Sequence, residues 1–257
     1  MPRFAANLSM MFNEVDFLDR FASARAAGFT AVEYLFPYDF SADEIARRLR
    51  DNGLTQALFN LPPGDWAAGQ RGLACMPQAY DEVMRGVERA LPYIEATGVR
   101  RVHLMAGLGV RSDTAQLAAY KRALAAVAAR LAREQVDLLI EPINTRDMPG
   151  YFLDNFDVAM AIIEDLALPN LKLQFDIYHR QILHGDVTIA LREMFPRIGH
   201  IQIASVPARN EPMAGELNDV FLFAELDRLG YDGFVGCEYR PAGKTEAGLG
   251  WFAPWRV

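Results

Sequence analysis

Residues Asp137–Asn144 read Asp-Leu-Leu-Ile-Glu-Pro-Ile-Asn, and this stretch decides how the rest of the chain is interpreted. Three consecutive apolar residues, between a helical segment and a loop, are typical of a buried strand. The strand runs into Glu141, and a buried carboxylate is costly unless it is paired or binds a metal. The rest of the chain therefore has to supply a partner for Glu141.

Size and charge narrow the class of protein. The 257 residues are enough for one large domain, and 51% of them are hydrophobic, which allows a sizeable core. There are 33 acidic and 26 basic residues, giving a net charge of −7. This balance argues against a general nucleic-acid binder, which usually has a basic face.

Three further features of the sequence bear on the cellular compartment in which the protein is expected. The two cysteines, Cys75 and Cys237, are far apart in sequence, so no disulfide framework is expected and a reducing compartment is favoured. The first residues lack the long apolar core of a signal peptide. No run approaches 18 apolar residues, so we expect no membrane contact and a cytoplasmic protein.

The strand at residue 137 belongs to a series of similar segments. Seven more apolar runs are bounded by turn residues, and helical patterns lie between them. We expect these strands over Phe4–Ser9, Ala31–Leu35, Leu54–Leu61, Arg101–Ala106, Leu171–Tyr178, Ile198–Ala204 and Phe234–Tyr239. Alternating strands and helices imply parallel strands, and eight such units predict a single-domain α/β protein, a (β/α)8 TIM barrel over residues 1–257. A doubly wound open sheet is the alternative, but Leu8–Phe12 lacks its glycine-rich turn.

Each expected strand has a polar residue near its carboxyl end, where a barrel builds its active site. Any one of them alone is more often a structural hydrogen-bonding residue, but eight in step with the strands indicate a site. They are Asn7, Glu33, Asn60, His103, Glu141, Asp176, Gln202 and Glu238.

Four of these residues, from the last four strands, form an oxygen-rich set. Three carboxylates and an amide oxygen suit Mg²⁺ or Mn²⁺ better than zinc. The alternative is a group of separate salt bridges, but the chain has only three lysines, none placed to enter the barrel mouth. We therefore expect a divalent metal held by Glu141, Asp176, Gln202 and Glu238.

Several residues outside the metal set are candidates for contacts with a substrate. His179, at the expected loop edge, and Arg209, in the loop after the seventh strand, are as easily surface residues as substrate ligands. If Arg209 lies above the site, it can hold a carboxylate with two hydrogen bonds. Asp65, with Trp66, lies in the long loop Pro62–Pro77 and is expected to form part of a lid. His200 is expected to be a core histidine.

Several short motifs together resemble one family, the hydroxypyruvate isomerases and 2-oxo-tetronate isomerases, which are xylose isomerase-like barrels. The similarity runs from residue 2 to about residue 255. The motifs are Phe4–Met10, Gly64–Gly69, Ile140–Asn144, Gly199–Ala204 and Gly236–Tyr239.

The resemblance implies the barrel fold and the metal set given above. It also implies that Glu141 and Glu238 are the catalytic acid–base pair. The relatives that epimerise free ketoses carry His where this chain has Gln202. A homo-oligomer is also implied.

The residues independently suit isomerisation. Moving a carbonyl between adjacent carbons requires removing a proton from one carbon and returning a proton to its neighbour, which two carboxylates can do. A metal would polarise the carbonyl. We therefore expect aldose–ketose isomerisation of a small hydroxy-oxo acid, either hydroxypyruvate to tartronate semialdehyde or 2-oxo-tetronate, through an enediolate. The expected substrate-binding residues are His179, Arg209, Asn7, Asn60, His103 and Asp65.

Other functions fit the sequence less well. A metal-dependent endonuclease of this barrel type needs many histidines and a basic groove, whereas the chain has four histidines and a net charge of −7. A Schiff-base aldolase needs an inward lysine late in a strand, and Lys172 stands at the start of one. A keto-sugar epimerase of the same barrel type and a non-catalytic sugar-acid binding protein remain as alternatives.

Overall fold

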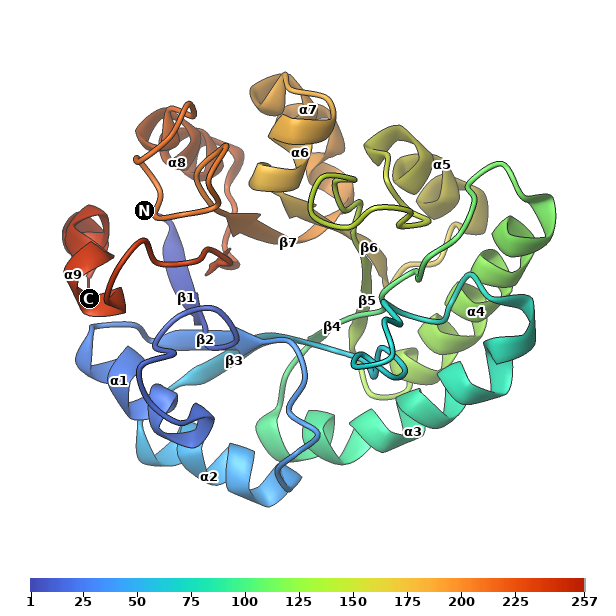
Figure 1. The fold of residues 1–257 in the computed structure, drawn as a ribbon, viewed down its shortest axis with the longest axis horizontal. Coiled ribbons are helices and arrows are strands. Elements are labelled where there is room, and N and C mark those ends of the chain that lie inside the picture. The colour runs from blue at the N-terminus through green and yellow to red at the C-terminus, as the bar shows by residue number, and fades with distance from the viewer. Residues whose placement is uncertain (257) are drawn as a thin grey trace.

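The computed structural model describes residues 1–256 as a closed barrel of eight parallel strands surrounded by helices (Figure 1). The strands are neighbours in chain order, and β1 closes the barrel by pairing in parallel with β8. This confirms the predicted TIM barrel. The strands are β1 Arg3–Asn7, β2 Ala31–Tyr34, β3 Thr55–Asn60, β4 Arg101–His103, β5 Asp137–Ile140, β6 Leu171–Asp176, β7 Ile198–Ile203 and β8 Phe234–Cys237.

The helices pack around the outside of the barrel. Sequence signals fix several of their first residues: Ser41 accepts a hydrogen bond from the Glu44 N–H, and Asp113 accepts from Ala115 and Gln116. The helices are α1 Arg20–Ala26, α2 Ala42–Asp51, α3 Tyr80–Thr97, α4 Thr114–Ala132, α5 Phe156–Leu166, α6 Ile177–Leu183, α7 Val187–Met194, α8 Asp219–Leu229 and α9 Thr245–Gly248.

The main difference from the sequence prediction lies after β6. The strand was expected to continue to Tyr178, but it ends at Asp176, and α6 begins at the next residue. Ile177 and Tyr178 are buried apolar residues, so their pattern does not distinguish the end of a strand from the start of a buried helix. As a consequence, His179 lies buried in the first turn of α6 and not at the edge of a loop.

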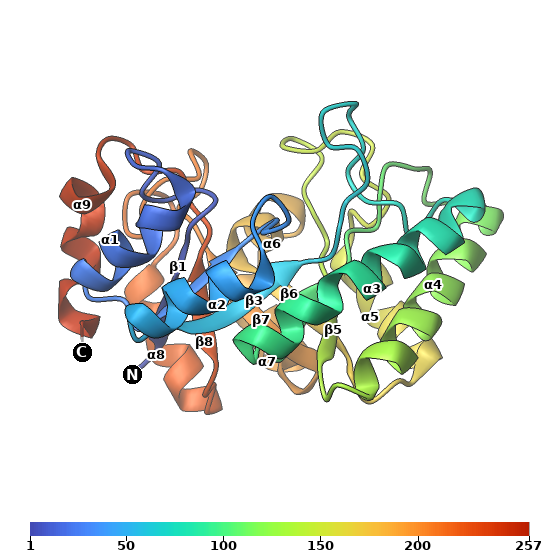
Figure 2. The same cartoon turned by 90° about the horizontal axis from the view of Figure 1, so that it is seen from below.

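Long loops stand at the carboxyl ends of the strands. Figure 2 shows that the loop after β3 (residues 61–76) and the loop after β5 (residues 141–155) project from the same end of the barrel. Within residues 1–256, no helix is both long and apolar enough to cross a membrane. Cys75 and Cys237 are buried and free, as expected.

Candidate active site

A cavity of about 250 Å³ opens among the loops at the carboxyl ends of the strands. It brings together six of the residues that the sequence predicted for the site. These are Asn60, His103, Glu141, His179, Arg209 and Glu238. The loops add four residues that carry charge or an aromatic ring: Trp66, Arg71, Asp147 and Arg240.

Glu141 lies directly after β5 with its carboxylate buried in the cavity wall. Within the described chain, its Oε1 atom has no hydrogen-bond partner, and its Oε2 atom is 3.6 Å from Nδ1 of His103. Burial raises the pKa of Glu141 well above its usual value, and the charges of Glu238 and Asp176 raise it further. Burial also lowers the pKa of His103 to about 3, so this histidine is neutral and does not pair with Glu141 as a cation.

Glu238 lies directly after β8 and faces the same cavity. Its Oε1 atom accepts a hydrogen bond of 3.2 Å from Arg209 Nη2. Burial raises the pKa of Glu238 to about 8, although the positive charge of Arg209 opposes the shift. Glu141 and Glu238 are therefore two interacting carboxyls that both hold protons more tightly than usual, and such pairs are suited to acid–base work near neutral pH.

Asp176 has two roles, one for each oxygen. Its Oδ1 atom caps α6 by accepting hydrogen bonds from the N–H groups of Tyr178 and His179, at 2.7 and 3.4 Å. Its Oδ2 atom forms no hydrogen bond in the described part of the chain and lies 3.6 Å from His179 Nε2. Burial raises the pKa of Asp176 to about 6, against the effect of Arg209 and the two N–H groups.

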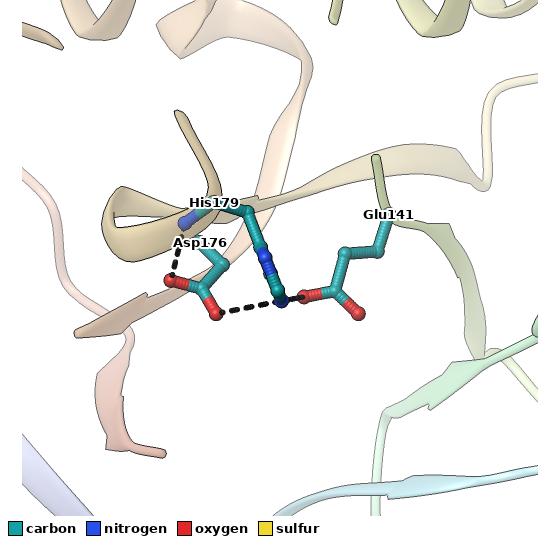
Figure 3. Close-up of side chains that lie close together, drawn as sticks. All are labelled: Glu141, Asp176 and His179. Carbon is teal, nitrogen blue, oxygen red and sulfur yellow. Dashed lines mark hydrogen bonds and ion pairs between the residues drawn. The ribbon is translucent and has the colours of Figure 1, made fainter. Parts of the chain in front are cut away.

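His179 is held in one orientation by Asn144, which follows β5. The Nδ1 atom of His179 faces the backbone N–H of Asn144 at 3.2 Å and its side-chain Nδ2 atom at 2.6 Å. The Asn144 amide cannot be reversed without losing a bond, because its Oδ1 atom accepts from the N–H of Asp147 at 2.9 Å. Since Nδ1 accepts and burial keeps the ring neutral, the proton of His179 lies on Nε2. Figure 3 shows the ring between the carboxylates of Asp176 and Glu141.

Arg209 is buried within the site, which resolves the alternative of a surface position. Its guanidinium pairs with Asp147 at 3.0 Å and with Glu238 at 3.2 Å, and lies 4.9 Å from the ring of Tyr178. Burial acts to lower the pKa of Arg209, but the surrounding carboxylates outweigh it and raise the pKa. Arg209 therefore remains charged, and both of its terminal nitrogens form ion pairs with carboxylates of the protein.

Gln202 and Asn7 belong to a hydrogen-bond network beneath the cavity, centred on Glu33. The Oε1 atom of Glu33 accepts from Asn7 at 3.0 Å and from Gln202 at 2.8 Å, and its Oε2 atom lies 2.6 Å from His200 Nε2. This confirms His200 as a satisfied core histidine. Gly236 on β8 leaves room for the network, because a Cβ atom there would lie 2.3 Å from a Glu33 oxygen.

Asp65 is the one predicted site residue that remains on the surface. Its carboxylate accepts a hydrogen bond from the N–H of Ala68, 2.9 Å away in the same loop. The side chain is exposed and does not line the cavity. The loop contributes Trp66 and Arg71 to the cavity instead.

Comparisons with known proteins agree on the family. The model of the xylose isomerase-like TIM barrel matches residues 21–255. A 2-oxo-tetronate isomerase from Cupriavidus necator is 56% identical over 99% of both chains, and a hydroxypyruvate isomerase from Escherichia coli is 44% identical over 100% of both. The chain belongs to the hydroxypyruvate isomerase family. Membership confirms the resemblance seen in the sequence and makes the chain an isomerase.

A solved structure of the same shape carries a different description. A Brucella melitensis protein described as an AP endonuclease of family 2 is 49% identical, covers 100% of both chains and superimposes with a TM-score of 0.97. Several epimerases of free or modified sugars share the barrel at much lower identity; D-allulose 3-epimerase from Methylomonas, for example, is 16% identical with a TM-score of 0.80. These epimerases show only the fold.

The side chains present in this member of the family are chemically suited to a divalent metal. One ligand atom from each of Glu141, Asp176 and His179 lies within 4.8 Å of the others. The two carboxylate oxygens are buried without a hydrogen-bond partner in residues 1–256, and such oxygens suit Mg²⁺ or Mn²⁺. His179 differs, because its Nε2 atom carries a proton. Gln202 retains one free lone pair on Oε1, whose other contact is Gln174 Nε2 at 2.7 Å.

Sequence reasoning missed four residues that shape the site. Asn144 and Asp147 follow Glu141 in the loop after β5, whereas Arg71 and Arg240 come from loops after β3 and β8. Polar residues within seven positions of the end of β5 were a usable signal for Asn144 and Asp147. Arg71 gave no such signal, because only the path of its long loop brings it to the cavity.

Proposed function

We propose that this protein is a metal-assisted aldose–ketose isomerase acting on a small hydroxy-oxo acid. The observation that carries the proposal is the placement of Glu141 and Glu238 on one cavity of about 250 Å³, with a raised pKa at each carboxyl. Two such carboxyls can divide the work of a proton donor and a proton acceptor.

With hydroxypyruvate, the reaction moves a carbonyl from C2 to C3. One glutamate removes a proton from C3, giving an enediolate, and a proton is delivered to C2 from the other glutamate. The hydroxyl proton passes from O3 to O2, so the product is tartronate semialdehyde and the atoms balance. Glu141, Asp176, Glu238 and Gln202 would hold a divalent cation, which would supply Lewis-acid stabilisation of negative charge on the substrate oxygen.

Two other side chains have defined tasks in this proposal. The proton on His179 Nε2 is available to a substrate oxygen, because the opposite ring nitrogen is held by Asn144. Arg209 keeps Glu238 in place and offsets part of the negative charge that four nearby carboxyl groups bring to the site. Asn60 and His103 line the cavity and complete its polar wall.

The names of the relatives point to acids of three or four carbons as substrates. Hydroxypyruvate and 2-oxo-tetronate, named for the Escherichia coli and Cupriavidus necator relatives, both carry a carboxylate next to the pair of reacting carbons. We therefore propose both as substrates, with preference for 2-oxo-tetronate because the relative that bears its name shares more of this sequence.

Endonuclease activity is a second candidate because of the name of the Brucella melitensis structure. A duplex substrate requires a broad basic surface, whereas this chain has a net charge of −7 and a small cavity walled by carboxylates. Those features favour a small-molecule substrate.

The test is a comparison of turnover of hydroxypyruvate and 2-oxo-tetronate, with and without a chelator, followed by proton NMR. We expect conversion of at least one acid, loss of conversion after chelation, and recovery with Mg²⁺ or Mn²⁺. Full activity in the chelated protein would exclude the role of the metal, and no conversion of either acid would exclude the proposed substrates.

A further inference from the structure

We infer that Arg71 and Arg240 bind the carboxylate of the substrate at the mouth of the cavity, an assignment that rests on the proposed function. Arg209 was the arginine expected for this task, but its terminal nitrogens already pair with Asp147 and Glu238. Moving Arg209 to a substrate would leave those two carboxylates without their partner, which is costly in a buried site.

The two remaining arginines of the cavity wall form no ion pair with a carboxylate of the described residues. Within residues 1–256, Arg71 bonds only to backbone carbonyls, those of Trp66 and Gln70, at 3.1 and 2.8 Å through Nη1. The side chain of Arg240 is exposed and forms no ion pair in the described chain. Both guanidinium groups are therefore available to an anion.

Arg71 is held ready for an incoming ligand. Its guanidinium lies 4.0 Å from the centre of the Trp66 ring, and the two carbonyl contacts fix Nη1. Nε and Nη2 have no hydrogen-bond partner among the described residues, and two adjacent N–H donors of arginine match the two oxygens of a carboxylate. A donor pair already fixed in position loses little conformational entropy when a ligand binds.

The location of the two arginines agrees with the layout of the site. Glu141 and Glu238 lie at the strand ends, where the reacting carbons have to be placed, so the carboxylate of the substrate has to lie in another part of the cavity. Trp66 and Arg240 also line an adjoining groove of about 680 Å³, so they stand where the cavity meets the wider opening. A substrate oriented by these cations points its carboxylate outward and its reacting carbons toward the two glutamates.

One anchor serves both proposed acids. In hydroxypyruvate and in 2-oxo-tetronate, the carbonyl moves between the two carbons that follow the carboxylate. Holding the carboxylate therefore places the same pair of carbons before Glu141 and Glu238 in either acid. The same anchor makes a neutral sugar of equal size a poor substrate, because a molecule without a carboxylate gains no binding energy from the two arginines.

The test compares an acid with its neutral counterpart. Dihydroxyacetone has a CH2OH group in place of the carboxylate of hydroxypyruvate, and its isomerisation to glyceraldehyde moves the same carbonyl. We expect Arg71→Gln to raise the KM for the acid roughly 10- to 100-fold with little change in kcat, because a charge-assisted contact is lost. Turnover of dihydroxyacetone, or its competition with the acid, should stay within about twofold of the wild type.

Matched variants complete the experiment. Arg240→Gln should act in the same direction, and Arg71→Lys should recover part of the affinity because it restores the charge without the paired donors. Arg85→Gln makes the same change on the exposed surface of α3 and should alter neither substrate.

If the KM for the acid is unchanged in one glutamine variant, that arginine does not bind the carboxylate. If the KM is unchanged in both variants, the whole assignment is wrong. Equal losses for acid and triose would also overturn it, since they indicate a structural role. If the wild type converts neither acid, the proposed function fails before the arginines are tested.

Discussion

At the scale of single residues, the site depends on buried polar groups whose partners fix their chemistry. Glu141 was predictable, because a carboxylate at the end of an apolar strand requires an explanation. The state of His179 was not, since it depends on Asn144, a residue 35 positions away whose amide is itself oriented by Asp147. Sequence patterns identify residue types at strand ends, but not which nitrogen of a ring carries the proton.

Replacing Asn144 with aspartate should reverse the proton position on His179. The new carboxylate oxygen would accept a hydrogen bond from Nδ1 and so favour a proton there, in place of the present donor. We expect kcat for the acid to fall roughly 10- to 100-fold, by analogy with other residues that orient a functional histidine. The position of the proton can be read from the ¹⁵N chemical shifts of the ring nitrogens.

Asn155→Asp is the matched control for this substitution. Asn155 caps α5, and an aspartate at the same position caps a helix equally well. Identical ¹⁵N shifts for His179 in wild type and Asn144→Asp would show that the side chain of Asn144 does not set the proton position, which would then be fixed by the backbone N–H of the same residue.

At the scale of elements, the loop after β3 depends on a close backbone approach. Gly72 has a φ of +107°, and a Cβ atom there would lie 2.4 Å from the carbonyl oxygen of Met105. This contact holds the base of the loop that carries Trp66 and Arg71. The length of the loop indicated a functional segment, but its anchor at Gly72 depends on contact with a distant segment and was not readable from the sequence.

Gly72→Ala should therefore loosen the loop after β3. We expect a loss of about 1–3 kcal/mol in the free energy of unfolding, from the positive φ and the collision together. The KM for the acid should rise, because Arg71 would be displaced. Urea unfolding and steady-state kinetics measure both effects.

Gly69→Ala is the control that separates backbone strain at a positive φ from the steric clash of the added Cβ atom. Gly69 also has a positive φ, +91°, but no atom of residues 1–256 lies within 4 Å of an added Cβ atom. We expect this variant to be the milder of the two, with a KM near that of the wild type. Equal effects of the two substitutions would show that the contact with Met105 does not anchor the loop.

At the scale of the whole molecule, the order of strands and helices was the most predictable property. Eight repeats of an apolar run and a helical pattern allow few arrangements, and the structure has the expected one. The start of α6 was missed because buried helices and strands share an apolar composition. The gathering of three carboxyls from β5, β6 and β8 followed from the barrel itself, since all strand ends meet at one rim.

These three carboxyls should make the metal-free protein less stable as pH rises. Burial raises the pKa of Asp176 to about 6 and of Glu238 to about 8, and raises that of Glu141 as well. Through these carboxyls the folded protein binds more protons than the unfolded chain between pH 5 and 8. Burial lowers the pKa of His103 and His179, which opposes this effect below about pH 6.5, so stability falls most steeply above that pH. We expect the Tm in chelator to fall by more than about 3 °C from pH 5.5 to pH 8.

Two controls accompany the pH series. Glu238→Gln removes one of the titrating groups and should flatten the dependence. Mn²⁺ should raise the Tm most at pH 8, where the carboxylates are ionised. A Tm that rises over this interval in chelator would contradict the placement of three unneutralised carboxyls in one buried site.

The most direct test of the central claim is NMR of the reaction in D₂O with wild type, Glu141→Gln and Glu238→Gln. In the presence of Mg²⁺ or Mn²⁺, the wild type should form the isomer with deuterium at the carbon that receives the proton. Both variants should retain the fold, measured by circular dichroism, and lose at least about 100-fold in rate, the range of general acid–base catalysis. Near-normal turnover by either variant would contradict the assignment of the two glutamates as the proton-transferring pair.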